Sequence, residues 1–164
     1  MHPWIVFLHL LGVFGLLLAH GASASATFAL RRERNLDRVR ALLELSANSY
    51  GVMYTSLLVL LVSGIVGGFT YPGGAWSQGW IWVALGLLIA IVVAMTVLGS
   101  RVYGGARKLV GLPFMEGMKT HPPIEPARAE EIDALLAKGN PLLLTIVGYG
   151  GIAVIAWLMM FKPF

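Results

Sequence analysis

The chain has 164 residues, of which 57% are hydrophobic and 12% are charged, and its formal net charge at pH 7 is +4. This composition is too apolar and too poor in charge for a soluble domain, so one membrane-embedded unit is the simplest interpretation. The absence of cysteine excludes disulfides, thiolate ligands for metals or haem, and a cysteine nucleophile. The positive charge favours contact with anionic lipid headgroups and argues against nucleic acid as a partner.

The charged residues are concentrated in two stretches, 31–44 and 101–138. Together these hold all eight carboxylates and eleven of the twelve Lys and Arg residues, and Lys162 is the remaining cation. Loops rich in Lys and Arg stay on the cytoplasmic side during membrane insertion, so both stretches are expected there. Two cytoplasmic loops in turn imply four spans, with both termini outside the cell.

Four apolar segments are long enough to cross a hydrocarbon core of about 30 Å, which takes about 20 residues of helix. The predicted spans are 4–30, 49–69, 80–100 and 141–161, and the cytoplasmic loops are 31–48 and 101–140. All five tryptophans fall at the outer interface, where an amphipathic indole prefers to lie. We therefore predict an all-α fold, a four-helix transmembrane bundle in which residues 1–164 form a single multi-pass domain of the cell (plasma or inner) membrane.

Both cytoplasmic loops are expected to contain helix beyond the spans. Asn35 can cap a helix with Asp37 in its first turn, where a negative charge is favourable, so the second helix is expected to start inside the cytoplasm. After an extended proline-rich segment, Pro126 suits the first turn of another helix that Gly139 ends. Its apolar face could lie on the inner leaflet or dock on the protein.

The first span contains two histidines, His9 and His20. They are eleven residues apart, which is three helical turns plus about 20°, so they lie on one face and about 16 Å apart along the axis. Because ionisable residues within a membrane usually face the bundle interior, this face is predicted to point inward. Neutral imidazole is a ligand for haem iron, copper or zinc, so both histidines are candidate cofactor ligands. They belong to two sites, or one belongs to a site and the other is structural. The alternative is an imidazole that hydrogen-bonds to a neighbouring helix.

The second span carries small and polar residues at alternating spacings of three and four, the pattern of a left-handed helix pair. These residues are Ser46, Ser49, Met53, Ser56, Leu60, Ser63 and Gly67. Such a seam packs helices closely in lipid, or it lines a pocket that faces the histidines. The spans contain no Asp, Glu, Lys or Arg, which argues against a proton relay or an ion-coupled transport site. No catalytic residue is predicted, because motifs for hydrolysis or phosphate binding are absent.

The segment Leu8–Gly15, in which a histidine precedes a small-residue face, resembles an uncharacterised bacterial family of predicted four-span integral membrane proteins. The similarity extends through the arginine-rich first loop and Leu57–Phe69. That family is distantly similar to the membrane protoporphyrinogen oxidases, which bind haem b, and to the copper-resistance D proteins. The resemblance implies that His9 occupies the place of the oxidase's first-helix histidine. The oxidases also use a lysine in their third helix, and Trp80–Ser100 has none, which argues against oxidase activity.

Three functions are compatible with these features. The first is binding of haem b or a metal ion such as copper, with His9 as first axial ligand and Met53, Met95, a water or His9 of a second protomer as the other. The second is a non-catalytic helical accessory or scaffold subunit of a larger membrane complex, which needs only four packed spans and glycine-rich faces. The third is passage or export of a small apolar or neutral solute through the Ser and Gly seam.

Overall fold

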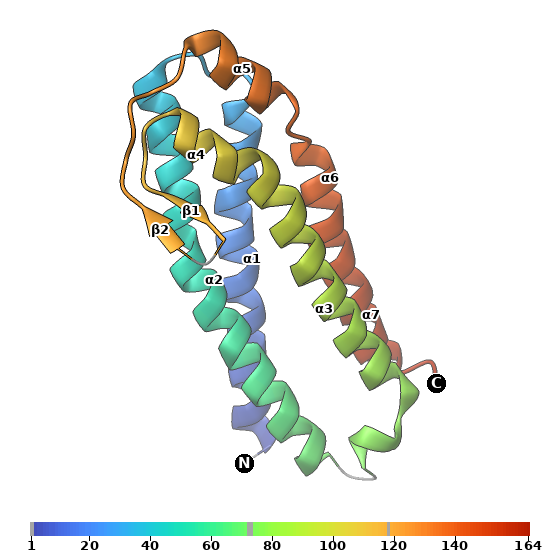
Figure 1. Cartoon of the computed structure of the whole chain (residues 1–164). Coiled ribbons are helices and arrows are strands. Elements are labelled where there is room, and N and C mark those ends of the chain that lie inside the picture. Colours follow the sequence, from blue (N-terminus) through green and yellow to red (C-terminus); the bar gives the residue numbers. More distant parts are fainter. Residues whose placement is uncertain (1, 72–73, 118) are drawn as a thin grey trace.

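The computed structural model describes residues 2–71, 74–117 and 119–164. The predicted all-α four-helix bundle is confirmed, with one short hairpin added at its charged end (Figure 1). The helices are α1 (His2–Leu30), α2 (Leu36–Thr70), α3 (Gly79–Gly99), α4 (Gly105–Leu109), α5 (Ala129–Ala137), α6 (Pro141–Thr145) and α7 (Gly151–Phe161). Between them lie a 3-10 turn, η1 (Ala75–Ser77), two π-helical segments, η2 (Ser100–Gly104) and η3 (Ile146–Gly150), and the strands β1 (Phe114–Glu116) and β2 (Lys119–His121).

Four continuous helical segments are long and apolar enough to cross a membrane, namely Pro3–Leu30, Leu36–Thr70, Gly79–Leu109 and Pro141–Phe161. Their outward faces carry large apolar side chains that would be unfavourable in water, among them Leu18 at 72% and Phe69 at 76% exposure. Length and surface together identify a multi-pass membrane protein whose helices contact the lipid bilayer.

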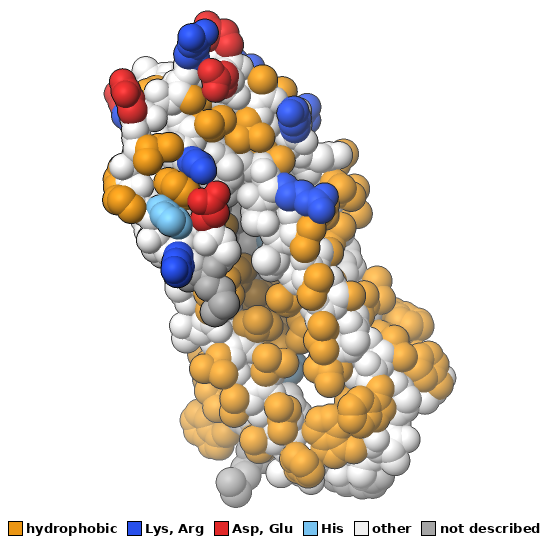
Figure 2. Space-filling model, in the orientation of Figure 1, with side chains coloured by type: hydrophobic (Ala, Val, Ile, Leu, Met, Phe, Trp, Pro, Cys, Tyr) orange, Lys and Arg blue, Asp and Glu red, His pale blue; other side chains and the backbone are white. Residues whose placement is uncertain are grey.

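The bundle has two chemically different ends. Both termini and the α2–α3 connection lie at one end, which we call the terminal end (Figure 1). Charged side chains gather at the opposite end, which we call the charged end (Figure 2). The helices pair as α1 with α2 and as α3 with α7, and α6 brings the second pair against α1.

The predicted seam on α2 is confirmed as the contact with α1. The Ser23 and Ser49 hydroxyl oxygens are 2.8 Å apart. Farther along the seam, a Cβ atom added to Gly12 would lie 3.0 Å from both the Leu60 backbone nitrogen and the Ser56 carbonyl oxygen. Glycine therefore allows the two backbones to approach more closely than any side chain would permit.

A buried apolar cluster closes the charged end. Its members are Leu30, Val39, Leu43, Ala106, Val110, Leu112, Ile132 and Leu136. The apolar face of α5 thus docks on the protein, which decides between the two positions predicted for it. The helix begins at Ala129 rather than in the turn of Pro126, because the Ala127 backbone N–H donates to the Leu109 carbonyl at 2.8 Å and holds this stretch extended. The helix that begins with α3 runs on through η2 and α4 to Leu109, whereas a loop was expected from residue 101.

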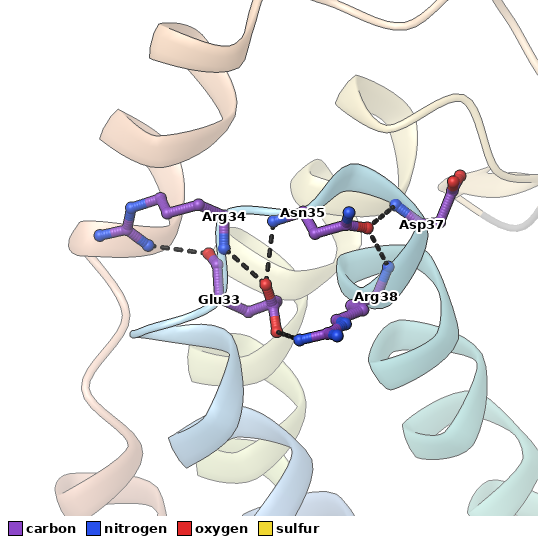
Figure 3. A network of polar contacts seen from close by, with 5 residues as sticks. All are labelled: Glu33, Arg34, Asn35, Asp37 and Arg38. Carbon is purple, nitrogen blue, oxygen red and sulfur yellow. Dashed lines mark hydrogen bonds and ion pairs between the residues drawn. The ribbon is translucent and has the colours of Figure 1, made fainter.

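The turn between α1 and α2 is held by a polar network (Figure 3). As predicted, Asn35 caps α2, and its side-chain oxygen accepts from the backbone N–H groups of Asp37 and Arg38 at 3.0 and 3.1 Å. One Glu33 carboxylate oxygen accepts from the N–H groups of Arg34 and Asn35, both at 2.9 Å. The other lies 3.8 Å from the Arg38 guanidinium. The turn is thus built around an ionised glutamate.

Acid is expected to weaken this turn. Hydrogen bonds from the backbone N–H of Asn35 and then of Arg34, together with the Arg38 charge, lower the pKa of Glu33 below its ordinary value of 4.5. A lowered folded-state pKa stabilises the fold above the unfolded-state pKa, and this stability is lost as pH falls through the folded-state value. The melting temperature of wild type should exceed that of Glu33→Gln at about pH 7, and the difference should shrink below about pH 4.5. Glu44→Gln, which removes an exposed carboxylate farther along α2, is the control, and a constant difference for Glu33→Gln would contradict the prediction.

Candidate functional site

A cavity of about 530 Å³ lies between the two helix pairs in the terminal half of the bundle. Apolar side chains from α1, α2, α3 and α7 form nearly all of its wall. Figure 2 shows a hollow between the helix pairs, on the side of the bundle and surrounded by hydrophobic side chains. The polar side chains that reach the wall include His9, Ser63, Tyr71 and Lys162. The cavity is therefore an apolar space with a few separated polar groups.

His9 reaches the cavity wall and also contacts α2. Its Nδ1 atom lies 3.1 Å from the Ser63 hydroxyl oxygen. The same hydroxyl donates to the α2 backbone, with the Val59 and Leu60 carbonyl oxygens at 2.5 and 3.1 Å. While its one hydrogen is directed there, the hydroxyl accepts from Nδ1, and the lone pair of the neutral ring is on Nε2. A cavity-lining imidazole whose other nitrogen donates to the protein has the arrangement found in metal-ligating histidines.

Gly64 makes room for this ring. A Cβ atom added at Gly64 would lie 3.3 Å from Cε1 of His9, a tighter contact than side chains normally make. The histidine therefore sits against bare backbone on one side and against the cavity on the other.

His20 lies in the interior, as predicted, but outside this cavity. It is 8% exposed, and its ring packs edge-on against Tyr149 at a centroid distance of 4.7 Å. Any side chain at Gly148, in the π-helical segment η3, would collide with it. Within the described residues its Nε2 has no hydrogen-bond partner. The structure thus places His9 at the cavity wall and His20 in a packed contact with η3, so the two do not share a site.

The remaining possible ligands differ from those predicted. Met159 lines the cavity, whereas Met53 and Met95, which the sequence suggested as second axial ligands, are not part of its wall. Among the residues that the structure describes, no group of three His, Cys, Asp or Glu side chains could hold a metal ion. Tyr71 and Lys162 also reach the wall and were not predicted as site residues. The one sequence signal for Lys162 was its isolation from the other cations.

The volume and chemistry of the cavity limit what it can hold. Pockets for cofactors and other organic ligands usually measure about 300–1,000 Å³, with apolar walls and few polar groups, so a volume of 530 Å³ fits this class. His9 supplies the imidazole on the wall of that space. No protein-family model, no curated protein and no solved structure matches this chain.

Proposed function

We propose that this chain is a multi-pass protein of the cell membrane that binds haem b in the terminal-half cavity, with Nε2 of His9 as the axial ligand. The observation that carries the proposal is the His9–Ser63 hydrogen bond at the wall of a large apolar cavity, since a bond donated by Nδ1 would leave Nε2 free to bind iron. Haem iron held by a protein imidazole exchanges electrons or binds a small molecule at its open position.

The ligand set favours haem over a bare copper or zinc ion. A zinc or copper site built from protein side chains alone commonly needs three or more ligands, and the described residues offer no such group of His, Cys, Asp or Glu. Haem brings four nitrogen ligands of its own and needs only one or two from the protein. A single histidine at an apolar wall is therefore enough for haem and insufficient for a free ion. Met159 is the methionine that can supply the sixth ligand.

The proposed orientation places the charged end in the cytoplasm and both termini outside. It is supported by the Lys and Arg content of the charged end, since basic loops are retained on the cytoplasmic side. The aromatic contacts Trp4–Phe7, Trp76–Trp82 and Trp157–Phe161 all occur toward the terminal end, as expected for an interfacial belt. The resemblance of Leu8–Gly15 to the family described above supports His9 as the haem ligand, because it implies that His9 occupies the place of the oxidase's first-helix histidine.

Purification after expression with added haem precursor and copper tests the proposal. We expect a Soret band with near-stoichiometric iron, which His9→Ala abolishes because it removes the iron ligand. His20→Ala should keep the band, since His20 lies outside the cavity. His121→Ala is the control for loss of a histidine elsewhere, because this residue lies on strand β2 and stacks on Phe114 rather than lining the cavity.

Absence of a Soret band from wild type after addition of haem would overturn the haem proposal. Stable co-purification with other membrane subunits would then favour the scaffold function. Retention of the band in His9→Ala would overturn the ligand assignment while keeping haem binding itself.

A further inference from the structure

The strongest unassigned feature is the ammonium group of Lys162 at the cavity wall. Its Nζ atom donates to the Tyr71 hydroxyl at 2.8 Å and lies 4.6 Å from the centre of the same ring. The centre of the Trp80 ring is 6.0 Å from the same Nζ atom. These aromatic contacts hold the cation in place without neutralising it.

No Asp or Glu side chain lies close to Lys162. All eight belong to 31–44 and 101–138, which lie at the opposite end of the bundle, and the four ion pairs among the described residues are all found there. Because the Lys162 side chain is exposed, its ammonium group is solvated and carries its charge without an acidic partner. An anionic group of a molecule in the cavity can pair with this charge and accept a hydrogen bond from the Tyr71 hydroxyl.

The backbone fixes where this cation lies. Lys162 ends α7 in the left-handed conformation, with φ 46°, and its N–H donates to the Leu158 carbonyl at 2.9 Å. Glycine is the usual residue at such a cap, because a side chain there costs about 1 kcal/mol or more. The following tail is held in turn, since the Trp80 N–H donates to the Phe164 carbonyl oxygen at 3.4 Å.

We propose that Lys162 binds the carboxylate head of the cavity's ligand, so that the ligand class is an amphiphile with a large apolar body and a carboxylate. This inference rests on the proposed function and deepens it, because haem b carries two propionates on an apolar ring. A free fatty acid offers the same chemistry from a second source. In both cases the apolar body fills the cavity and the carboxylate pairs with the ammonium group.

Titration of haem b and of its dimethyl ester tests the contact. The ester keeps the iron and the ring but has no carboxylate. We expect Lys162→Gln to weaken haem b binding about tenfold to a hundredfold, the usual value of a charge-assisted hydrogen bond, and to leave the ester unchanged. Lys162→Arg should restore most of the affinity because it keeps the cation. Lys138→Gln, which removes an exposed lysine at the charged end, is the matched control.

A second titration distinguishes haem b from a free fatty acid as the source of the carboxylate, and it tests the inference even if haem does not bind. The probes are a fluorescent fatty acid, cis-parinaric acid, and its methyl ester. A loss of haem b affinity in Lys162→Gln that the dimethyl ester does not show identifies the propionate as the head that Lys162 binds. If wild type binds only the fatty acid, and Lys162→Gln weakens it tenfold or more without affecting the ester, the haem proposal fails and the carboxylate site stands. Equal affinity of wild type and Lys162→Gln for both acids, or no binding of either acid, would overturn the inference.

Discussion

Replacing Gly12 with leucine is expected to lower the free energy of unfolding by about 3 kcal/mol. A Cβ atom at this position already lies 3.0 Å from two atoms of the α2 backbone, the Leu60 nitrogen and the Ser56 carbonyl oxygen. Backbone atoms cannot rotate away as a flexible side chain can, so a larger residue must push α1 and α2 apart along the whole seam. Titration with a denaturing detergent in mixed micelles measures the change.

Gly51→Leu is the matched control, because it makes the same substitution on α2 where no atom lies within 4 Å of an added Cβ. It should change the free energy of unfolding by no more than about 0.5 kcal/mol. Equal destabilisation by the two substitutions would mean that the close approach of α1 and α2 at Gly12 does not limit the stability of the bundle.

Ser63→Ala is expected to weaken haem binding about tenfold to a hundredfold, the usual cost of losing the partner that orients a metal-binding histidine. The Ser63 hydroxyl is the partner of Nδ1 of His9, and as an acceptor it favours the tautomer with its proton on that nitrogen. Without it the imidazole can place its proton on Nε2, the atom that must bind iron, and can also turn about its side-chain bonds. Haem titration followed at the Soret band measures the loss.

Ser49→Ala is the control for this experiment. It removes another hydroxyl of the same seam, the one bonded to Ser23, two turns or more from the cavity. We expect it to leave haem affinity within about twofold, since it touches neither the imidazole nor the cavity wall. A comparable loss in both variants would show that seam packing, rather than the orientation of His9, determines affinity.

Much of the fold could be predicted because its signals are local or strictly periodic. The Asn35 cap depends on a side chain and two N–H groups within three residues. The α1–α2 seam follows from spacings of three and four that bring Ser49, Ser56 and Ser63 to one face of α2. The confinement of charge to two stretches of sequence likewise indicated one charged end, as Figure 2 shows.

The site was harder to predict because it depends on how the two helix pairs meet. The spacing of eleven residues correctly placed His9 and His20 on one inward face of α1. It could not show that His9 lines a cavity while His20 packs against Gly148. The π-helical segment η3 adds a residue to one turn, which rotates the side chains after it by about 100° relative to a regular helix. A regular helical repeat extended from Leu144 therefore assigns the wrong face to Met159 and Lys162, both of which reach the cavity wall.

The cavity lies on the side of the bundle, so the fraction of protein with a bound ligand should depend on the surrounding lipid or detergent. An acyl chain of a neighbouring phospholipid can enter the cavity without passing through water, so the lipid and the ligand compete for the same volume. The apparent dissociation constant of any ligand of the cavity should then rise linearly with the amount of competing amphiphile, from its intrinsic value at zero amphiphile. Values obtained in nanodiscs and in micelles become comparable only after extrapolation to zero amphiphile.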